Sequence, residues 1–152
     1  MKSDIIQKYS KKSYSQLHKT AKRWFHKYIK LRDTDEYGYG NCIATGERLK
    51  YGTEKAQAGH FFAAGKHKAL EFNEDNVNMQ SKQDNYFGHD FASYSMNLIN
   101  KIGMERMKQL DQKARASKKG FFKEDKYLMI EIIEKYKQKV KELAKTKMFE
   151  VK

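Results

Sequence analysis

Three polar side chains stand in an order that suits phosphodiester hydrolysis: His60, Asn76 and Asn85. A neutral imidazole accepts a proton from water near pH 7, so His60 could generate the nucleophile. An oxygen ligand such as Asn85 could hold a hard divalent cation, which neutralises charge on the phosphate and on the leaving 3′ oxygen. Asn76 could tie its loop to the neighbouring strand and orient the histidine. The pattern predicts a hydrolytic site, but three residues at loose spacing also suit unrelated proteins.

The surroundings of these residues indicate which elements carry them. Glycines punctuate short runs in the centre of the chain, which predicts strands at 41–45 and 55–62 joined by tight turns. A polar loop follows over 63–75, and 77–87 is predicted as a short helix with Asp75 or Asn76 as its N-cap. Histidine on a strand, asparagine in a loop and asparagine on a helix is the order of HNH, or ββα-metal, nucleases.

The flanks of the chain are helical by pattern. Apolar and aromatic residues recur every three or four positions across 10–31, and two similar faces span 94–110 and 129–143. The absence of proline suits long helices. We interpret the first aromatic stripe as core, although stacking on bases is the alternative. A turn is predicted at 117–120.

The predicted fold class is therefore α+β: a small ββα-metal (HNH-like) core with a β-hairpin and a short helix, flanked by long basic helices. A length of 152 residues suits a single domain. Its parts are an N-terminal basic helix at 11–33, the core at 37–90 and C-terminal helices at 91–148.

Positive charge is concentrated in the flanks. Lys and Arg number 32 against 19 Asp and Glu, so the formal net charge is +13. Residues 1–40 carry +6, residues 41–90 carry −1 and residues 91–152 carry +8. Basic helices around a nearly neutral centre suit a protein that contacts a phosphate backbone, which makes DNA the expected partner. Lysines that only solubilise a helix face are the alternative at any single position.

The cysteine count and the hydropathy of the chain exclude several classes of protein. A single cysteine, Cys42, excludes an internal disulfide and a zinc site built from several thiolates. No run has the length or apolar character of a signal peptide or a membrane span, so we expect a cytoplasmic protein that does not bind a membrane.

Several runs of residues form a wider pattern, most of them in the centre of the chain. They are Ala58-Gly59-His60-Phe61, the segment from Leu70 to Val77, and then Gln80, Asn85 and Tyr94. The pattern continues after Tyr94 in Leu98-Ile99 and Ile102-Gly103. Outside the centre it includes the segments 28–33 and 136–143. Over residues 12–145 the chain resembles the NinG (Rap) family of phage recombination endonucleases.

The resemblance implies an endonuclease that cuts branched recombination intermediates, of Holliday junction or D-loop type, with one Mg²⁺ or Mn²⁺ per site. By position, His60 is then the general base, Asn76 the central structural asparagine and Asn85 the metal ligand on the helix. Gln57 stands where the family tends to carry a carboxylate. An amide binds a divalent cation more weakly, so we expect substitute ligands from Asp84, His89 and Asp90.

A second departure concerns zinc. Family members usually hold a structural zinc with two Cys-x-x-Cys pairs, whereas here Cys42 stands with Thr45, Ser81 and Asp84 at the other three positions. We therefore expect no structural zinc in this chain.

Further expectations concern the partner. DNA contacts are expected from the first helix and from the loop after the first core strand: Lys22, Arg23, Arg32, Lys66, His67 and Lys68. By analogy with two-fold branched substrates, a homodimer is a hypothesis. The resemblance also implies a phage or prophage gene expressed in a bacterial cell.

Two other functions stay open at this point. One is a DNA-binding protein of the same fold that has lost catalysis, which Gln57 and the missing cysteines favour. The other is a helical module for RNA or DNA without HNH chemistry. For single residues, His60 could be a buried structural histidine, Asn76 only an N-cap and Asn85 an ordinary surface residue.

Overall fold

The computed structural model describes residues 2–88, 90–117 and 123–152. Within these ranges the chain forms six α-helices and four strands, and the strands pair into two antiparallel two-stranded sheets. The helices are α1 (Ser3–Lys8), α2 (Tyr14–Arg32), α3 (Lys82–Phe87), α4 (Phe91–Ile102), α5 (Met104–Ser117) and α6 (Lys126–Ala144). The strands are β1 (Tyr39–Asn41), β2 (Arg48–Lys50), β3 (Ala56–His60) and β4 (Val77–Ser81). The mixed α+β prediction is confirmed.

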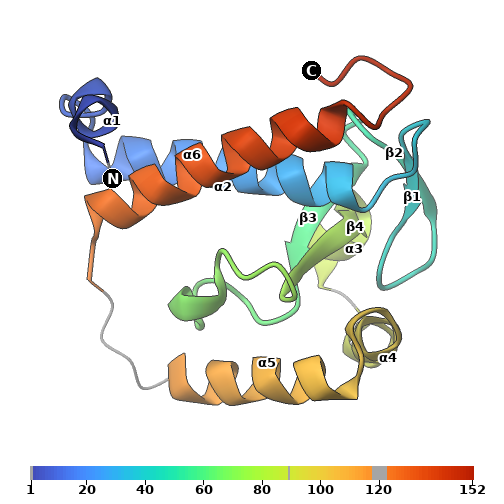
Figure 1. Cartoon of the computed structure of the whole chain (residues 1–152). Coiled ribbons are helices and arrows are strands. Elements are labelled where there is room, and N and C mark those ends of the chain that lie inside the picture. The colour runs from blue at the N-terminus through green and yellow to red at the C-terminus, as the bar shows by residue number, and fades with distance from the viewer. Residues whose placement is uncertain (1, 89, 118–122) are drawn as a thin grey trace.

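Among the described elements, α2 and α6 pack against each other most extensively, and they lie side by side in Figure 1. Helix α2 begins at a capping box, in which the Ser13 hydroxyl accepts from the Gln16 amide and the Gln16 side chain accepts from Ser13. Phe25 is fully buried and packs edge-on against Tyr136 of α6, with ring centroids 4.9 Å apart. The aromatic stripe of α2 is therefore core, as predicted.

The central hairpin pairs β3 with β4 in antiparallel register. Gln57 lies opposite Gln80, Gly59 opposite Asn78 and His60 opposite Val77. A second core lies beyond this hairpin, where β1, β2, α4 and α5 meet around side chains such as Leu49, Tyr94 and Leu110. In Figure 1 the β3–β4 hairpin and the loop that joins its two strands lie between the α2–α6 pair and α5.

The predicted helix over 77–87 is wrong in its first half. Residues Val77–Ser81 form β4, and only Lys82–Phe87 are helical, with the Ser81 hydroxyl accepting from the Asp84 amide as N-cap. Val77 and Met79 are apolar and alternate with Asn78 and Gln80, which is the two-residue period of a strand. Burial of all five β4 residues favoured the strand.

The predicted helical face over 94–110 belongs to two helices. The chain turns at Gly103, where φ is +88°, and its amide donates to the Ile99 carbonyl to end α4. Glycine adopts this backbone conformation at little cost. Residues 118–120 of the predicted turn at 117–120 lie outside the described residues.

Candidate functional site

Asn76 closes the loop that joins β3 to β4. Its side chain is fully buried: the Oδ1 accepts from the Phe62 amide at 2.8 Å, and the Nδ2 donates to the carbonyls of Phe62 and Leu70 at 3.0 Å each. Its own carbonyl accepts from the Phe61 amide at 2.8 Å. Asn76 does not cap a helix, because β4 follows it directly. The loop leaving His60 is therefore fastened to the strand that returns.

His60 ends β3 and faces α2. Its Nε2 lies 2.9 Å from the Glu71 carbonyl, and its ring stands edge-on to His26 of α2 with centroids 5.8 Å apart. Since a carbonyl only accepts, the Nε2 carries the proton and the Nδ1 carries the lone pair. Burial lowers the pKa of His60 below its ordinary value, the Lys22 charge lowers it further, and Glu71 opposes both. His60 is therefore neutral at pH 7.

His26 is a neutral neighbour of His60. Burial, with the charges of His60, Lys22 and Lys30, lowers the pKa of His26 to about 3. Its Nε2 is buried and has no hydrogen-bond partner among the described residues. An uncharged ring beside His60 adds little repulsion when His60 takes up a proton.

A second polar group lies between the hairpin and α3, and we call it the oxygen cluster: Gln57, Gln80, Asp84 and Asn85. The Asn85 Nδ2 donates to the Gln57 Oε1 at 3.0 Å, and the Gln80 Nε2 donates to Asp84. The Gln80 Oε1 is buried and finds no partner within the described part of the chain. It lies over Gly59, where an added Cβ would come within 1.6 Å of it. The cluster thus contains one carboxylate and three amides.

His60 and the oxygen cluster lie on opposite faces of the hairpin. Successive side chains of a strand point to opposite faces, so Gln57 and His60 diverge. Gln57 contacts Asn85 of α3, whereas His60 contacts His26 of α2. Across residues 2–88, 90–117 and 123–152, no three His, Cys, Asp or Glu side chains gather as a metal site. The expected base and the expected ligands are therefore separate groups, and the expected ligand His89 lies outside the described residues.

The four positions that correspond to the zinc cysteines of the family do meet in space. Cys42 is buried, and its Sγ accepts from the amides of Thr45 at 3.5 Å and Ser81 at 3.3 Å. Ser81 in turn caps α3 through the Asp84 amide. A hollow of about 640 Å³ opens beside Thr45, Ser81 and Asp84. Hydrogen bonds to one sulfur thus join the loop after β1 to the end of β4.

The expected DNA contacts divide into exposed and buried side chains. Lys22 and Arg23 are exposed on α2, and Lys66 and Lys68 are exposed in the loop after β3. His67 is buried instead, with its Nδ1 3.1 Å from the Ala114 carbonyl and from the Ser117 hydroxyl. His67 anchors α5, so a direct phosphate contact does not fit its position.

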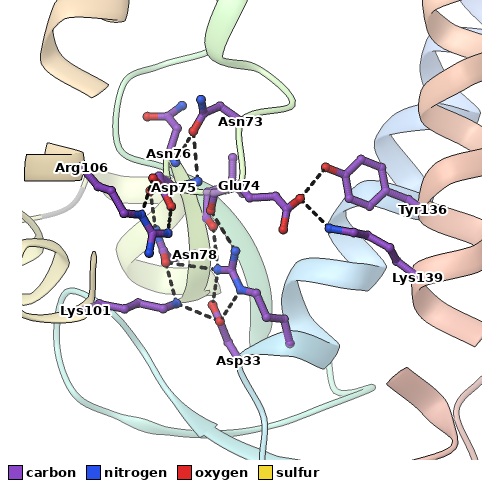
Figure 2. A network of polar contacts seen from close by, with 12 residues as sticks. Asp33, Asn73, Glu74, Asp75, Asn76, Asn78, Lys101, Arg106, Tyr136 and Lys139 are labelled. Carbon is purple, nitrogen blue, oxygen red and sulfur yellow. Dashed lines mark hydrogen bonds and ion pairs between the residues drawn. The ribbon is translucent and has the colours of Figure 1, made fainter. Parts of the chain in front are cut away.

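Arg32 is also turned inward. Its guanidinium pairs with Asp33 and donates to the carbonyls of Glu74 at 2.8 Å and Val77 at 3.0 Å. Lys101 of α4 reaches the same Asp33 carboxylate at 2.8 Å, and Figure 2 shows Lys101 and Asp33 meeting beside Asn78. Burial favours a raised pKa for Asp33, but the bonds and charges of Arg32 and Lys101 hold the pKa of that carboxyl below its usual value. A structural role explains Arg32 better than a phosphate contact.

One buried hydrogen-bonded pair beside His60 has no local signal in the sequence. Glu71 is 4% exposed, and its Oε1 lies 2.6 Å from the His18 Nε2 of α2. His18 lies among lysines on α2 and Glu71 lies in the loop after β3, so only the folded chain shows that they meet. Gln80 enters the prediction only as a residue that carries the family resemblance, although its place in the alternating β4 pattern predicts an inward amide.

Comparison with known proteins identifies one relationship. The family model described as Bacteriophage Lambda NinG protein matches residues 2–147. No curated protein and no solved structure matches the chain. In the described helices, none combines the length and the apolar character needed to cross a membrane.

Proposed function

The chain belongs to the NinG family of bacteriophage proteins, and on that premise we propose that it is a metal-dependent DNA endonuclease for branched recombination intermediates. Membership suggests a recombination-related function. The observation that carries the proposal is the loop closed by Asn76, because it fixes His60 at the end of β3, with Val77 of β4 paired opposite. Fixed geometry is what a general base requires.

The base is His60. Its Nε2–H donates to the Glu71 carbonyl, so the Nδ1 lone pair is available to take a proton from water. The resulting hydroxide attacks phosphorus, and the bond from phosphorus to the 3′ oxygen breaks. Because the pKa of His60 is lowered, the imidazole is in its accepting form at neutral pH.

The oxygen cluster supplies the donors for a divalent cation. Mg²⁺ and Mn²⁺ prefer oxygen ligands, and the buried Gln80 Oε1 without a partner among the described residues suits such an ion. Asp84, Gln80, Gln57 and Asn85 would hold it. When bound, the cation would neutralise charge on a phosphate at the α3 face of the hairpin, which is the face opposite His60.

DNA would follow α2 past His60. Lys22 and Arg23 are exposed on this helix, and Lys22 is close enough to His60 to lower its pKa. Together with the net charge of +13, these cations support contacts to the backbone, which recognise DNA shape and weaken with salt. We expect Lys22→Ala to lower the salt slope of binding by about 1, whereas Lys82→Ala, which removes a cation paired with Glu54, should leave it nearly unchanged.

A second candidate is a DNA-binding protein without catalysis. Two observations favour it: the oxygen cluster holds a single carboxylate, and His60 faces away from that cluster. On this alternative, the basic surface of α2 still binds branched DNA, and no phosphodiester is cut.

Cleavage assays separate the two candidates. Labelled four-way junction, flap and linear duplex are incubated with Mg²⁺ or Mn²⁺ and with the parent chain, His60→Gln or Asp84→Ala. His60→Gln keeps an amide that can donate to the Glu71 carbonyl but cannot act as a base, so the nuclease proposal expects a loss of about 100-fold or more with binding retained. Tight, salt-sensitive binding without cutting supports the second candidate, and no binding contradicts both.

Assembly is tested on the same substrates. We propose a homodimer on two-fold branched DNA, as analogy suggests. Sedimentation with a four-way junction should give two chains per junction, and one chain per junction contradicts the dimer.

A further inference from the structure

We propose that His18 and Glu71 form a positioning pair that sets the orientation of the His60 imidazole. The inference rests on the proposed function only in calling His60 the base. The geometry itself concerns three residues from three parts of the chain: α2, the loop after β3, and β3.

Glu71 contacts both histidines through different atoms. Its side-chain Oε1 lies 2.6 Å from the His18 Nε2, and its backbone carbonyl lies 2.9 Å from the His60 Nε2. The carbonyl that orients His60 therefore belongs to the residue whose side chain is bonded to α2. Any shift of Glu71 moves the acceptor of the His60 N–H.

The loop is restrained on both sides of that carbonyl. On one side, the Leu70 carbonyl accepts from the Asn76 Nδ2 at 3.0 Å. On the other side, Phe72 stands edge-on to the His18 ring, with centroids 6.0 Å apart. The His18 ring is also stacked on Tyr14, with an interplanar angle of 12° and centroids 5.7 Å apart. The Glu71 carboxylate thus binds a ring that is itself held in place.

Burial makes this hydrogen-bonded pair more than a surface contact. The Glu71 side chain is 6% exposed and that of His18 is 25% exposed. A buried carboxylate costs free energy unless it has a hydrogen-bond partner. We therefore expect the Glu71 side chain to shift toward water when His18 is removed. Movement of Glu71 takes its carbonyl away from His60 and frees the ring to rotate.

Nuclear magnetic resonance tests the pair without any DNA. A ring N–H bonded to a carbonyl inside a protein exchanges slowly with water, whereas a free one exchanges rapidly. We expect the His60 Nε2–H to give a resolved signal in the parent chain, and that signal to be lost in His18→Ala and Glu71→Ala. Glu71→Gln keeps an oxygen that can accept from the His18 Nε2–H, so it should retain the signal.

The matched control is Glu54→Gln. Glu54 pairs with Lys82 on the protein surface, on the α3 side of the hairpin, so Glu54→Gln should leave the His60 N–H signal unchanged. Backbone amide spectra confirm that each variant is folded. Persistence of the His60 signal in His18→Ala overturns the proposal, and so does loss of the signal in Glu54→Gln.

Cleavage adds an independent readout. If the parent chain cuts DNA, His18→Ala should lower kcat about tenfold with KM unchanged, and Glu71→Gln should restore most of the Glu71→Ala loss. If the parent chain does not cut, the nuclease proposal fails while the N–H measurement still decides the positioning pair. Equal kcat in His18→Ala and in the parent chain contradicts the positioning role.

Discussion

Replacement of Asn76 by alanine should be among the most damaging single changes to this fold. Its side chain is fully buried and makes three hydrogen bonds, to the Phe62 amide and to the carbonyls of Phe62 and Leu70. Phe62 is half-buried, so water can partly replace two of the bonds at a cost of about 1 kcal/mol each. The Leu70 carbonyl lies inside, where an unpaired acceptor costs about 2 kcal/mol. The expected loss is about 4 kcal/mol.

Urea unfolding followed by circular dichroism measures this loss. For a chain of this length, about 4 kcal/mol corresponds to a fall in Tm of about 12 °C. The control is Asn97→Ala, which removes one exposed bond to the Ile43 carbonyl and should cost about 1 kcal/mol or less. A loss below about 1 kcal/mol in Asn76→Ala would refute the claim that this side chain fastens the loop.

Asn76→Asp tests the same contacts through pH. The introduced carboxylate still accepts from the Phe62 amide but faces two carbonyls, so its pKa in the folded state is raised above the unfolded value. A group with a raised pKa contributes stability below its unfolded pKa and loses it as the pH rises through the folded pKa. The stability deficit against the parent chain should therefore grow from pH 4 toward pH 8, and a constant deficit would contradict the contact geometry.

Three other outcomes follow from contacts described above. Asp33→Asn should cost about 3 kcal/mol at pH 7 by urea unfolding, because it leaves Arg32 and Lys101 without their carboxylate. The pKa of Asp33 is lowered from 3.8, so the Asp33 carboxylate stabilises the fold above that value, and this stabilisation is lost as the pH falls through the folded pKa. The free energy of unfolding should therefore fall less steeply with acid in Asp33→Asn than in the parent chain. The same acid dependence in both would contradict the pairing of Asp33 with Arg32 and Lys101. Gly59→Ala should cost about 2 kcal/mol because its Cβ meets the Gln80 Oε1, and less than half as much in a Gln80→Ala background; an equal cost in both backgrounds would contradict that clash. Mass spectrometry should find zinc below about 0.1 per chain, since a single thiol stands at the Cys42 position; stoichiometric zinc would overturn that expectation.

The spacing of apolar residues predicted the long helices of the fold. It did not predict short elements whose structure depends on tertiary contacts. The spacing of Leu17, Ala21 and Phe25 identified α2, because a helix core face repeats every three or four residues. The predicted helix over 77–87 is wrong at β4, although Val77 and Met79 alternate with amides there. Five residues are too few for periodicity alone to decide between strand and helix.

The candidate site was predictable in its members but not in its arrangement. His60 and Asn76 could be identified from residue type and order, and the structure places both at the ends of the same hairpin loop. Arg32 looked like a phosphate contact because sequence shows a cation on a basic helix. It does not show the carbonyls of Glu74 and Val77, which the fold brings to that guanidinium. The odd spacing of Gln57 and His60 puts them on opposite faces once β3 is known to be a strand. The pairing of Gln57 with Gln80 depends on strand register, which no local pattern specifies.

The packing of α2 against α6 also sets the order of events during synthesis. The apolar face of α2, with Phe25 and Ile29 at its centre, leaves the ribosome long before residues 126–144 exist to cover it. A nascent chain exposes this aromatic surface until translation is nearly finished, and exposed apolar surface is what chaperones bind and what drives aggregation. The α2–α6 half must therefore fold after synthesis of α6, whereas the β1–β2 hairpin and the β3–β4 hairpin can pair earlier.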